Sequence, residues 1–153
     1  MIVERITEIN NTVFDTIYDA NSASIIENTG YDDKENLRKT FSSEADNFYL
    51  FSFTKEATEM RAAEVTGYVQ AFGKGDEITV YNSVTKSTSV LIEAVSGSNV
   101  LLKSLGFTYL NVDCVKDTSM YNYIKAACNR LDLFEYISEQ EREDDIIIKL
   151  RLL

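Results

Sequence analysis

Histidine, proline and tryptophan are absent from this 153-residue sequence, and cysteine occurs only twice. Without histidine, the chain has no serine–histidine or cysteine–histidine nucleophile pair, no imidazole metal ligand and no imidazole that titrates near neutral pH. The two cysteines, Cys114 and Cys128, are too few for a disulfide scaffold and predict reduced, buried thiols of a cytosolic chain. These absences argue against an enzyme and favour a structural or binding protein.

Signals for secretion and membrane insertion are also missing. The first residues, Met-Ile-Val-Glu-Arg-Ile-Thr-Glu, lack the basic and apolar regions of a signal peptide, so no secretion through a signal peptide is expected. Because no apolar run approaches about 18 residues, the sequence predicts no membrane span.

Negative charge dominates the composition. The 15 Lys and Arg residues stand against 25 Asp and Glu residues, which gives a formal net charge of −10. Such a chain is a poor sequence-independent binder of nucleic-acid phosphates. The hydrophobic share of 44% and the charged share of 26% are ordinary for a globular protein. A chain of this length can bury a core, and we expect a single domain over residues 1–153.

The amino-terminal third predicts a helix followed by a loop. Apolar residues three and four positions apart indicate an amphipathic helix that ends near residues 20–22. Its apolar face is formed by Ile2, Ile6, Ile9, Val13 and Ile17. Residues 21–46 are expected to form a long loop with one or two helical turns around residues 34–41, held to the body by Leu37 and Phe41.

The central part predicts two strands and an ambiguous segment. Residues 47–54 are rich in aromatic side chains and indicate a strand buried on both faces. Residues 61–72 indicate a second, alternating strand, which Gly-Lys-Gly-Asp at 73–76 ends sharply. Residues 76–95 favour a helix, although Ile-Thr-Val-Tyr-Asn and Ser-Val-Leu-Ile-Glu-Ala could instead pair as a hairpin across residues 83–87.

The sequence after residue 95 predicts alternating helices and strands. The central helix is expected to break at Ser-Gly-Ser 96–98, resume, and end at Gly106, followed by a strand at 107–112. Residues 117–131 indicate another helix, and the alternation over 146–153 indicates a strand held in a sheet.

Between that helix and the last strand, residues 133–137 fit either a helix end or a strand, and residues 138–145 predict an exposed turn. The elements together predict an α/β (α+β) fold. We expect a mostly antiparallel or mixed sheet of about four strands, flanked by two or three helices, with the C-terminal strand in the sheet.

Two clusters of carboxylates and two aromatic residues are the candidate functional side chains. The carboxylates are Asp32, Asp33, Glu141, Glu143, Asp144 and Asp145. They lie in polar, loop-like sequence, which favours solvated surface charge over a catalytic pair. Tyr68 and Phe72 fall on the more polar face of their strand and are candidates for a subunit interface. No catalytic residue, metal site or cofactor is predicted.

The order of the expected elements resembles a known family. The strand at 48–53, the sequence Tyr-Val-Gln-Ala-Phe-Gly-Lys-Gly at 68–75, the helix at 76–95 and Leu-Gly-Phe at 105–107 follow the amino-terminal helix. The chain closes with Glu-Arg-Glu at 141–143 and Ile-Ile-Ile-Lys-Leu-Arg-Leu-Leu. This order is similar to that of the tail terminator (tail completion) proteins of long-tailed bacteriophages.

The resemblance implies a non-enzymatic structural protein of the virion tail and neck, assembled in the bacterial host cytoplasm. Such a protein forms a homo-oligomeric ring, expected to be a hexamer, which caps the tail tube and joins it to neck proteins. DNA passes through the ring without specific binding, and no small-molecule substrate or membrane is expected. The acidic clusters would then line the channel and repel the DNA backbone.

Two other classes of function remain open from the sequence. An acidic inhibitor or immunity protein would cover a basic partner protein, and electrostatic steering would speed its association. An enzyme that relies on carboxylates is the least favoured class. The solution mass separates the first two, because a ring is a stable oligomer whereas an inhibitor is a monomer that binds with strongly salt-dependent kinetics.

Overall fold

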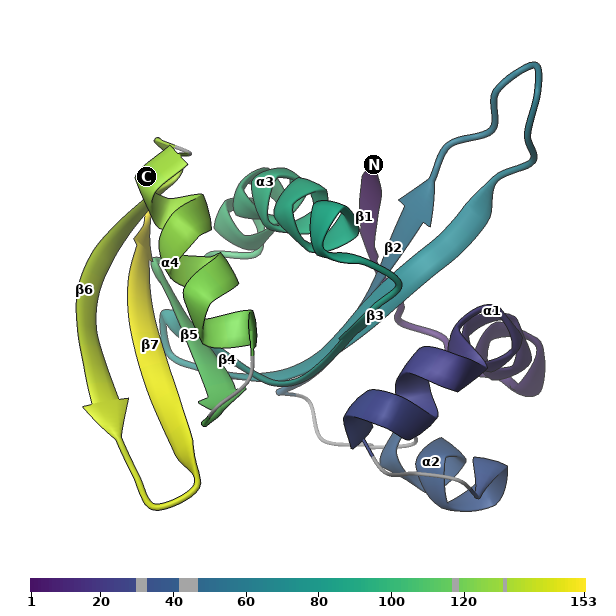
Figure 1. Cartoon of the computed structure of the whole chain (residues 1–153), viewed down its shortest axis with the longest axis horizontal. Coiled ribbons are helices and arrows are strands. Elements are labelled where there is room, and N and C mark those ends of the chain that lie inside the picture. Colours follow the sequence, from purple (N-terminus) through teal and green to yellow (C-terminus); the bar gives the residue numbers. More distant parts are fainter. Residues whose placement is uncertain (30–32, 42–46, 117–118, 131) are drawn as a thin grey trace.

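The computed structural model describes residues 1–29, 33–41, 47–116, 119–130 and 132–153. Within these residues the chain forms seven strands and four helices (Figure 1). In chain order they are β1 (Ile2–Arg5), α1 (Asn11–Thr29), α2 (Lys34–Phe41), β2 (Phe48–Lys55), β3 (Glu64–Lys74), β4 (Glu77–Thr85), α3 (Thr88–Ser104), β5 (Tyr109–Val115), α4 (Ser119–Arg130), β6 (Phe134–Glu141) and β7 (Asp145–Leu152). The strands form one mixed sheet in the order β1-β2-β3-β4-β5-β7-β6, in which β4 and β5 run parallel and the other neighbours antiparallel.

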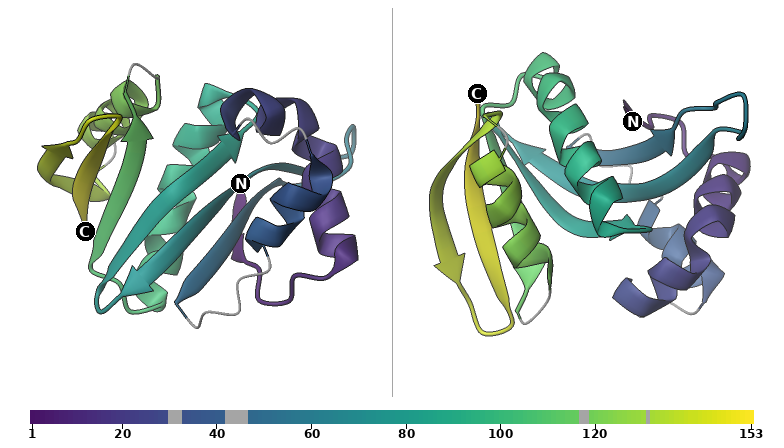
Figure 2. Two further views of the ribbon diagram at one scale, coloured as in Figure 1. Left: turned by 90° about the horizontal axis from the view of Figure 1, so that it is seen from below. Right: turned by 45° about the horizontal axis from the view of Figure 1, so that its top comes forward.

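The helices cover the two faces of the sheet unequally (Figure 2). α3 and α4 lie over one face, above a core that includes Leu102, Ile124 and Ile148. α1 and α2 lie against the other face over β2, β3 and β4, where Phe41 and Tyr68 are fully buried. No described helix covers β5, β7 and β6 on this second face. We call that uncovered area, with the adjoining part of β4, the open face.

β4 contains one residue more than its partner strand requires. Gln70 of β3 pairs with Asn82, whereas the next residue, Ala71, pairs with Val80, so Tyr81 forms a β-bulge. A bulge reverses the alternation of the side chains that follow it and bends the strand. Accordingly, Val80 packs toward the core under α3 and α4, whereas Val84 belongs to the core under α1 and α2.

The predicted amino-terminal helix is wrong at both ends. Residues 2–5 form β1, an edge strand that pairs with β2, and the helix begins only at Asn11. Asn10 caps it, because the backbone N–H of Val13 donates to the Asn10 side-chain oxygen at 3.0 Å. α1 then continues past the predicted end near residues 20–22. The buried Asn21 stays helical and donates its side-chain N–H to the Ile17 carbonyl at 2.8 Å.

Residues 76–95 form neither the favoured helix nor the alternative hairpin. They hold β4, which pairs with β3 and β5, and the start of α3. Strand partners distant in sequence therefore override the helical spacing of the apolar residues. The predicted break at Ser-Gly-Ser 96–98 is also wrong, since α3 runs through it. Gly97 lies where α3 approaches β1, and a Cβ atom there would be 3.1 Å from Val3 Cγ2.

Several local predictions are confirmed. Leu37 and Phe41 of α2 are fully buried, Gly106 ends α3 with a φ of 93°, and α4 lies within the predicted range 117–131. The C-terminal strand β7 lies between β5 and β6. The predicted sheet of about four strands with two or three helices is nevertheless wrong. β1 was not expected, β4 lies where a helix was favoured, and β6 extends from the ambiguous residues 133–137 into the predicted turn. β6 occupies the first half of the predicted turn at 138–145, and most of its side chains are exposed because it is an edge strand.

Candidate functional site

β4 and β5 separate after a short parallel contact. Their pairing covers four residue pairs and ends at Val80 and Val112. β4 then continues to Thr85 beside β3, and β5 continues to Val115 beside β7. In the part of the chain that the structure describes, no strand pairs with the two inner edges beyond that point. We call the space between these edges the fork.

The bulge at Tyr81 leaves backbone hydrogen-bonding groups of β4 directed into the fork. It follows Val80, the last residue of β4 that pairs with β5, and it bends β4 away. Since residues 82–85 pair with β3 along one side only, alternate backbone N–H and C=O groups of this stretch point into the fork. α3 begins at Thr88, three residues after β4 ends, so a helix N-terminus lies at the end of the fork (Figure 2).

An exposed aromatic pair lies on the open face beside the bulge. The rings of Phe72 and Tyr81 are 6.0 Å apart between centroids, and both side chains are more than 40% exposed. Burial of its hydroxyl end raises the pKa of Tyr81, so the phenol stays protonated at neutral pH. Protonated, Tyr81 can donate a hydrogen bond and offer a π face to a cation.

Three charged residues meet on the other side of the fork. Asp113 follows Val112 on β5, and its side chain is on the open face, as is that of Asn111, whose amide contacts Thr79 at 3.4 Å. The Arg142 guanidinium lies 3.2 Å from the Asp113 carboxylate, and its Nε donates to Asp145 Oδ1 at 2.6 Å. The cluster joins β5 to the turn between β6 and β7.

The two carboxylates of this cluster have opposite pKa shifts. Partial burial, followed by the hydrogen bond to Asp145 and that residue's negative charge, raises the pKa of Asp113 to about 6, and Arg142 opposes this rise. The hydrogen bond from Arg142 is the main cause that lowers the pKa of Asp145. Asp113 is therefore a stronger base than an ordinary aspartate but is still largely ionised at pH 7.

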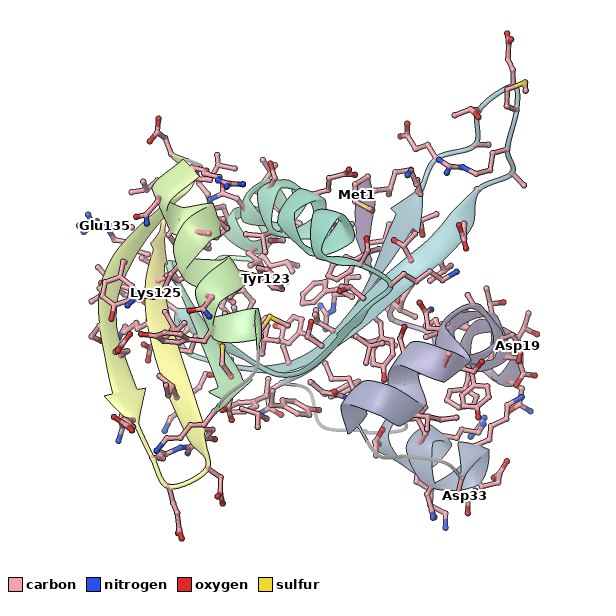
Figure 3. The ribbon with its side chains drawn as sticks, viewed as in Figure 1. Met1, Asp19, Asp33, Tyr123, Lys125 and Glu135 are labelled. Carbon is pink, nitrogen blue, oxygen red and sulfur yellow. The ribbon has the colours of Figure 1, made fainter. Side chains whose placement is uncertain are left out.

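The structure separates the acidic residues that the sequence singled out. Asp33 caps α2, since its Oδ1 accepts the Glu35 N–H at 2.9 Å, and it lies far from the β6–β7 turn (Figure 3). Asp32 lies outside the described residues. Glu141 pairs with Lys116 at 2.9 Å, whereas Glu143 and Asp144 are exposed in the turn. Only Asp145 reaches the cluster beside the fork.

The two aromatic candidates also have different positions. Tyr68 is fully buried against Phe41, with ring centroids 5.1 Å apart, so its side chain is not on the surface where a subunit interface would need it. The expected polar face of β3 is covered there by α1 and α2. Phe72, on the same face, lies beyond these helices and is exposed beside Tyr81.

The remaining reactive groups do not form a second site. Cys114 is buried as predicted, and burial raises its pKa to about 12, so it stays a thiol; Cys128 is half-buried. Among the described residues, no group of three or more acidic, cysteine or histidine side chains is arranged to hold a metal ion. No described helix is long and apolar enough to cross a membrane.

Solved structures share this fold over nearly the whole chain, although no protein-family model and no curated protein matches the sequence. The aminoglycoside 6'-acetyltransferase type Ii matches with a TM-score of 0.63 at 13% identity, over 99% of this chain and 96% of the other. An aminoglycoside 6'-N-acetyltransferase complexed with coenzyme A matches with a TM-score of 0.58 at 13% identity, over 99% and 96%. The ribosomal-protein-S18-alanine N-acetyltransferase of Escherichia coli matches with a TM-score of 0.59 at 10% identity, over 99% and 93%.

The fold is that of the GNAT acetyltransferases. This finding overturns the predicted function, a non-enzymatic ring protein of a phage tail, because the matching structures are enzymes and not tail terminators. The alternative of an acidic inhibitor has no support either. The expected set of partners, with tail and neck proteins and no small-molecule substrate, is also contradicted, since one neighbour with the GNAT fold holds coenzyme A.

The residues beside the fork form no motif in the sequence. Asp113 stands alone in the sequence, and Asp145 belongs to an acidic run that predicts solvated surface charge. The helix favoured for residues 76–95 includes Tyr81, which the structure instead places on a β-bulge. The one available signal was the alternation of 109–115, which puts Asp113 on the face opposite Leu110, Val112 and Cys114.

Proposed function

We propose that this protein is an N-acyltransferase that transfers an acyl group from a coenzyme A thioester to an amine. The observation that carries the proposal is the fork: a GNAT fold in which β4 and β5 part after Val80 and Val112 and leave strand-edge hydrogen-bonding groups beside a helix N-terminus. The net charge of −10 and the carboxylate cluster support an acceptor that is positively charged.

The residues at the fork fit coenzyme A by their chemistry. The pantetheine arm carries two amides, and the inner edge of β4 after the bulge offers backbone N–H and C=O groups that can pair with them as a strand would. The N-terminus of α3, a helix of 17 residues, favours the negative charge of the diphosphate. Lys86, which is paired with Glu64 just before α3, adds a positive charge nearby.

The bound thioester supplies an activated acyl carbon. The amine attacks that carbon, a C–N bond forms, the C–S bond breaks, and the thiol sulfur leaves with the electron pair and takes up a proton. Asp113 accepts the proton that the amine loses, and its raised pKa makes it suited to this task. Arg142 and Asp145 hold the Asp113 carboxylate in position, and Phe72 with Tyr81 offers π faces to the cationic parts of the acceptor.

Binding of coenzyme A is the first test. A ligand whose concentration is about 100 times its dissociation constant stabilises the folded state by about 2.7 kcal/mol. For a chain of this size, that raises the melting temperature by roughly 5–10 °C. We expect this shift with acetyl-coenzyme A at millimolar concentration and none with adenosine monophosphate.

Turnover is a separate test. It is measured by the release of free thiol from acetyl-coenzyme A in the presence of polyamines or aminoglycosides. A protein that binds no coenzyme A in calorimetry at millimolar concentration contradicts the proposal.

A further inference from the structure

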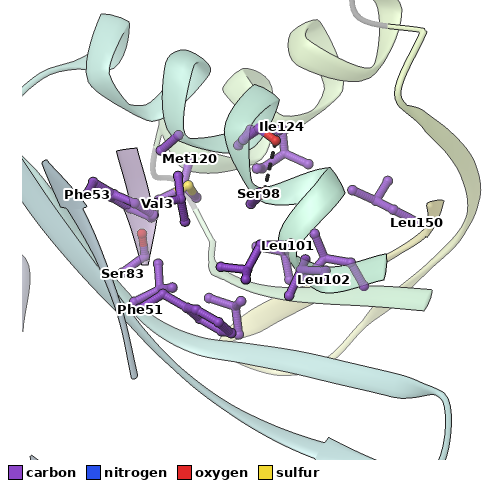
Figure 4. Close-up of a pocket in the computed structure, with 16 residues that line it drawn as sticks. Val3, Phe51, Phe53, Ser83, Ser98, Leu101, Leu102, Met120, Ile124 and Leu150 are labelled. Carbon is purple, nitrogen blue, oxygen red and sulfur yellow. Dashed lines mark hydrogen bonds between the residues drawn. The ribbon is translucent and has the colours of Figure 1, made fainter. Parts of the chain in front are cut away.

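An apolar cavity lies between the sheet and the helices α3 and α4 (Figure 4). Sixteen residues from β1, β2, β3, β4, β5, β7, α3 and α4 line it, and the only polar side chains among them are Ser83 and Ser98. The Ser98 hydroxyl donates to the Val95 carbonyl at 2.9 Å, so its polar atom is already engaged within α3. The cavity therefore fits an apolar occupant and offers almost nothing to a polar one.

The cavity adjoins the fork. Val80 and Val112, the last paired residues of β4 and β5, both line it, and so does Ser83 on the other side of the bulge. Met120 of α4 contributes to the wall on the α4 side. A molecule that pairs with the inner edge of β4 thus has this cavity next to it, on the side of the sheet opposite Asp113.

The size of the cavity exceeds what an acetyl group needs. Its volume is about 60 Å³. Since one water-sized group requires about 10–15 Å³ on this measure, the cavity holds roughly four to six such groups. Protein interiors are usually packed too densely to leave this much room in an apolar core.

We propose that this cavity is an acyl-chain site, and that the enzyme prefers acyl groups of about four to six carbons over acetyl. The inference rests on the proposed function, because it takes the occupant to be the acyl part of a coenzyme A thioester bound at the fork. The apolar lining fits the acyl chain, and the cavity lies beside the fork where the thioester would bind. The rest of the coenzyme A thioester is polar and would remain outside the cavity.

A chain-length series measures the site directly. Dissociation constants are determined by calorimetry for coenzyme A and for its acetyl, butyryl, hexanoyl and decanoyl thioesters. Each methylene that enters the cavity should tighten binding about fourfold, the equivalent of about 0.8 kcal/mol, so hexanoyl, which has four more methylenes, should bind up to about 250-fold more tightly than acetyl. The gain should stop before decanoyl, because that chain is longer than the cavity.

The outcomes separate the two proposals. If coenzyme A and all its thioesters fail to bind, the proposed function is wrong and this inference falls with it. If coenzyme A, acetyl-coenzyme A and hexanoyl-coenzyme A bind equally well, the proposed function stands and the acyl-chain site is wrong. A rising affinity from acetyl to hexanoyl supports both.

Two serines of α3 provide a matched pair of variants. Ser98 lines the cavity, whereas Ser104 is exposed at the end of the same helix, and each hydroxyl donates to the carbonyl three residues earlier. Ser98→Leu fills part of the cavity and should abolish the advantage of hexanoyl over acetyl while leaving the affinity for coenzyme A unchanged. Ser104→Leu should leave the whole series unchanged.

The smaller substitution Ser98→Val serves if Ser98→Leu lowers the unfolding midpoint so far that the chain does not fold. It should reduce the hexanoyl advantage at least threefold. An unchanged chain-length preference in a folded Ser98 variant overturns the proposal.

Discussion

The two faces of the sheet differ most at the fork. On the face under α3 and α4, the side chains around Val80 and Val112 are apolar and line a cavity. On the open face, an acidic cluster and an exposed aromatic pair lie on either side of the same two strands. Because alternate side chains of a strand point to opposite faces, one face of this strand pair provides apolar packing and the other presents charged and aromatic groups.

The largest expected effect comes from removing Asp113, the proposed general base on the open face. Asp113→Asn should lower the rate of acyl transfer by about 10²–10⁴-fold, because a general base contributes about that much. The dissociation constant of coenzyme A should not change, since Asp113 is on the face away from the cavity. Steady-state kinetics and calorimetry measure the two effects. Glu143→Gln, in the exposed turn nearby, is the matched control and should change neither.

Substitutions on the face under α3 and α4 should change the free energy of unfolding. Leu102 is 4% exposed and lines the cavity, and Leu102→Ala should lower the free energy of unfolding by about 2–5 kcal/mol. Val100, in the same helix, is 74% exposed, so Val100→Ala should change it by less than about 0.5 kcal/mol. Urea unfolding of both variants measures the difference. Equal losses would show that α3 does not pack as described.

The pH dependence should follow the cluster on the open face. With the pKa of Asp113 raised to about 6, the rate should be maximal above that pH and fall about tenfold for each unit below it, as the base becomes protonated. Asp145→Asn removes a negative charge that raises this pKa, so the midpoint should move to lower pH. Arg142→Gln removes the opposing positive charge and should move it upward. Profiles of kcat/KM with one acceptor amine measure these shifts, and identical midpoints in both variants contradict the assignment.

The smallest effect should come from the aromatic pair. Phe72→Leu removes a π face at an exposed position, where such an interaction with a cation contributes about 0.5–1 kcal/mol, so KM for a cationic acceptor should rise about two- to fivefold. KM for the acyl donor should stay constant, because its proposed binding site is the fork. A neutral amine as acceptor provides the control, and an equal rise for it would argue against a cation–π contact.

The elements that could be predicted from the sequence are those whose pattern of side chains is set by residues close to one another in the chain. The strict alternation of β7 and the apolar anchors Leu37 and Phe41 were visible because each depends on a few neighbouring residues. β1 and β4 were missed because their apolar spacing also fits a helix, and only pairing with distant strands decides between the two states. The cluster of Asp113 and Asp145 depends on the pairing of β5 with β7, which no local pattern encodes.

The bulge at Tyr81 means that the site depends on the number of residues in a strand more than on their identity. A single added residue turns the following side chains to the opposite face and parts β4 from β5, whatever those side chains are. A deletion of one residue from this stretch of β4 should therefore turn Asn82 and Val84 to the opposite face and disturb the opening, whereas a substitution that keeps the residue count should leave it in place.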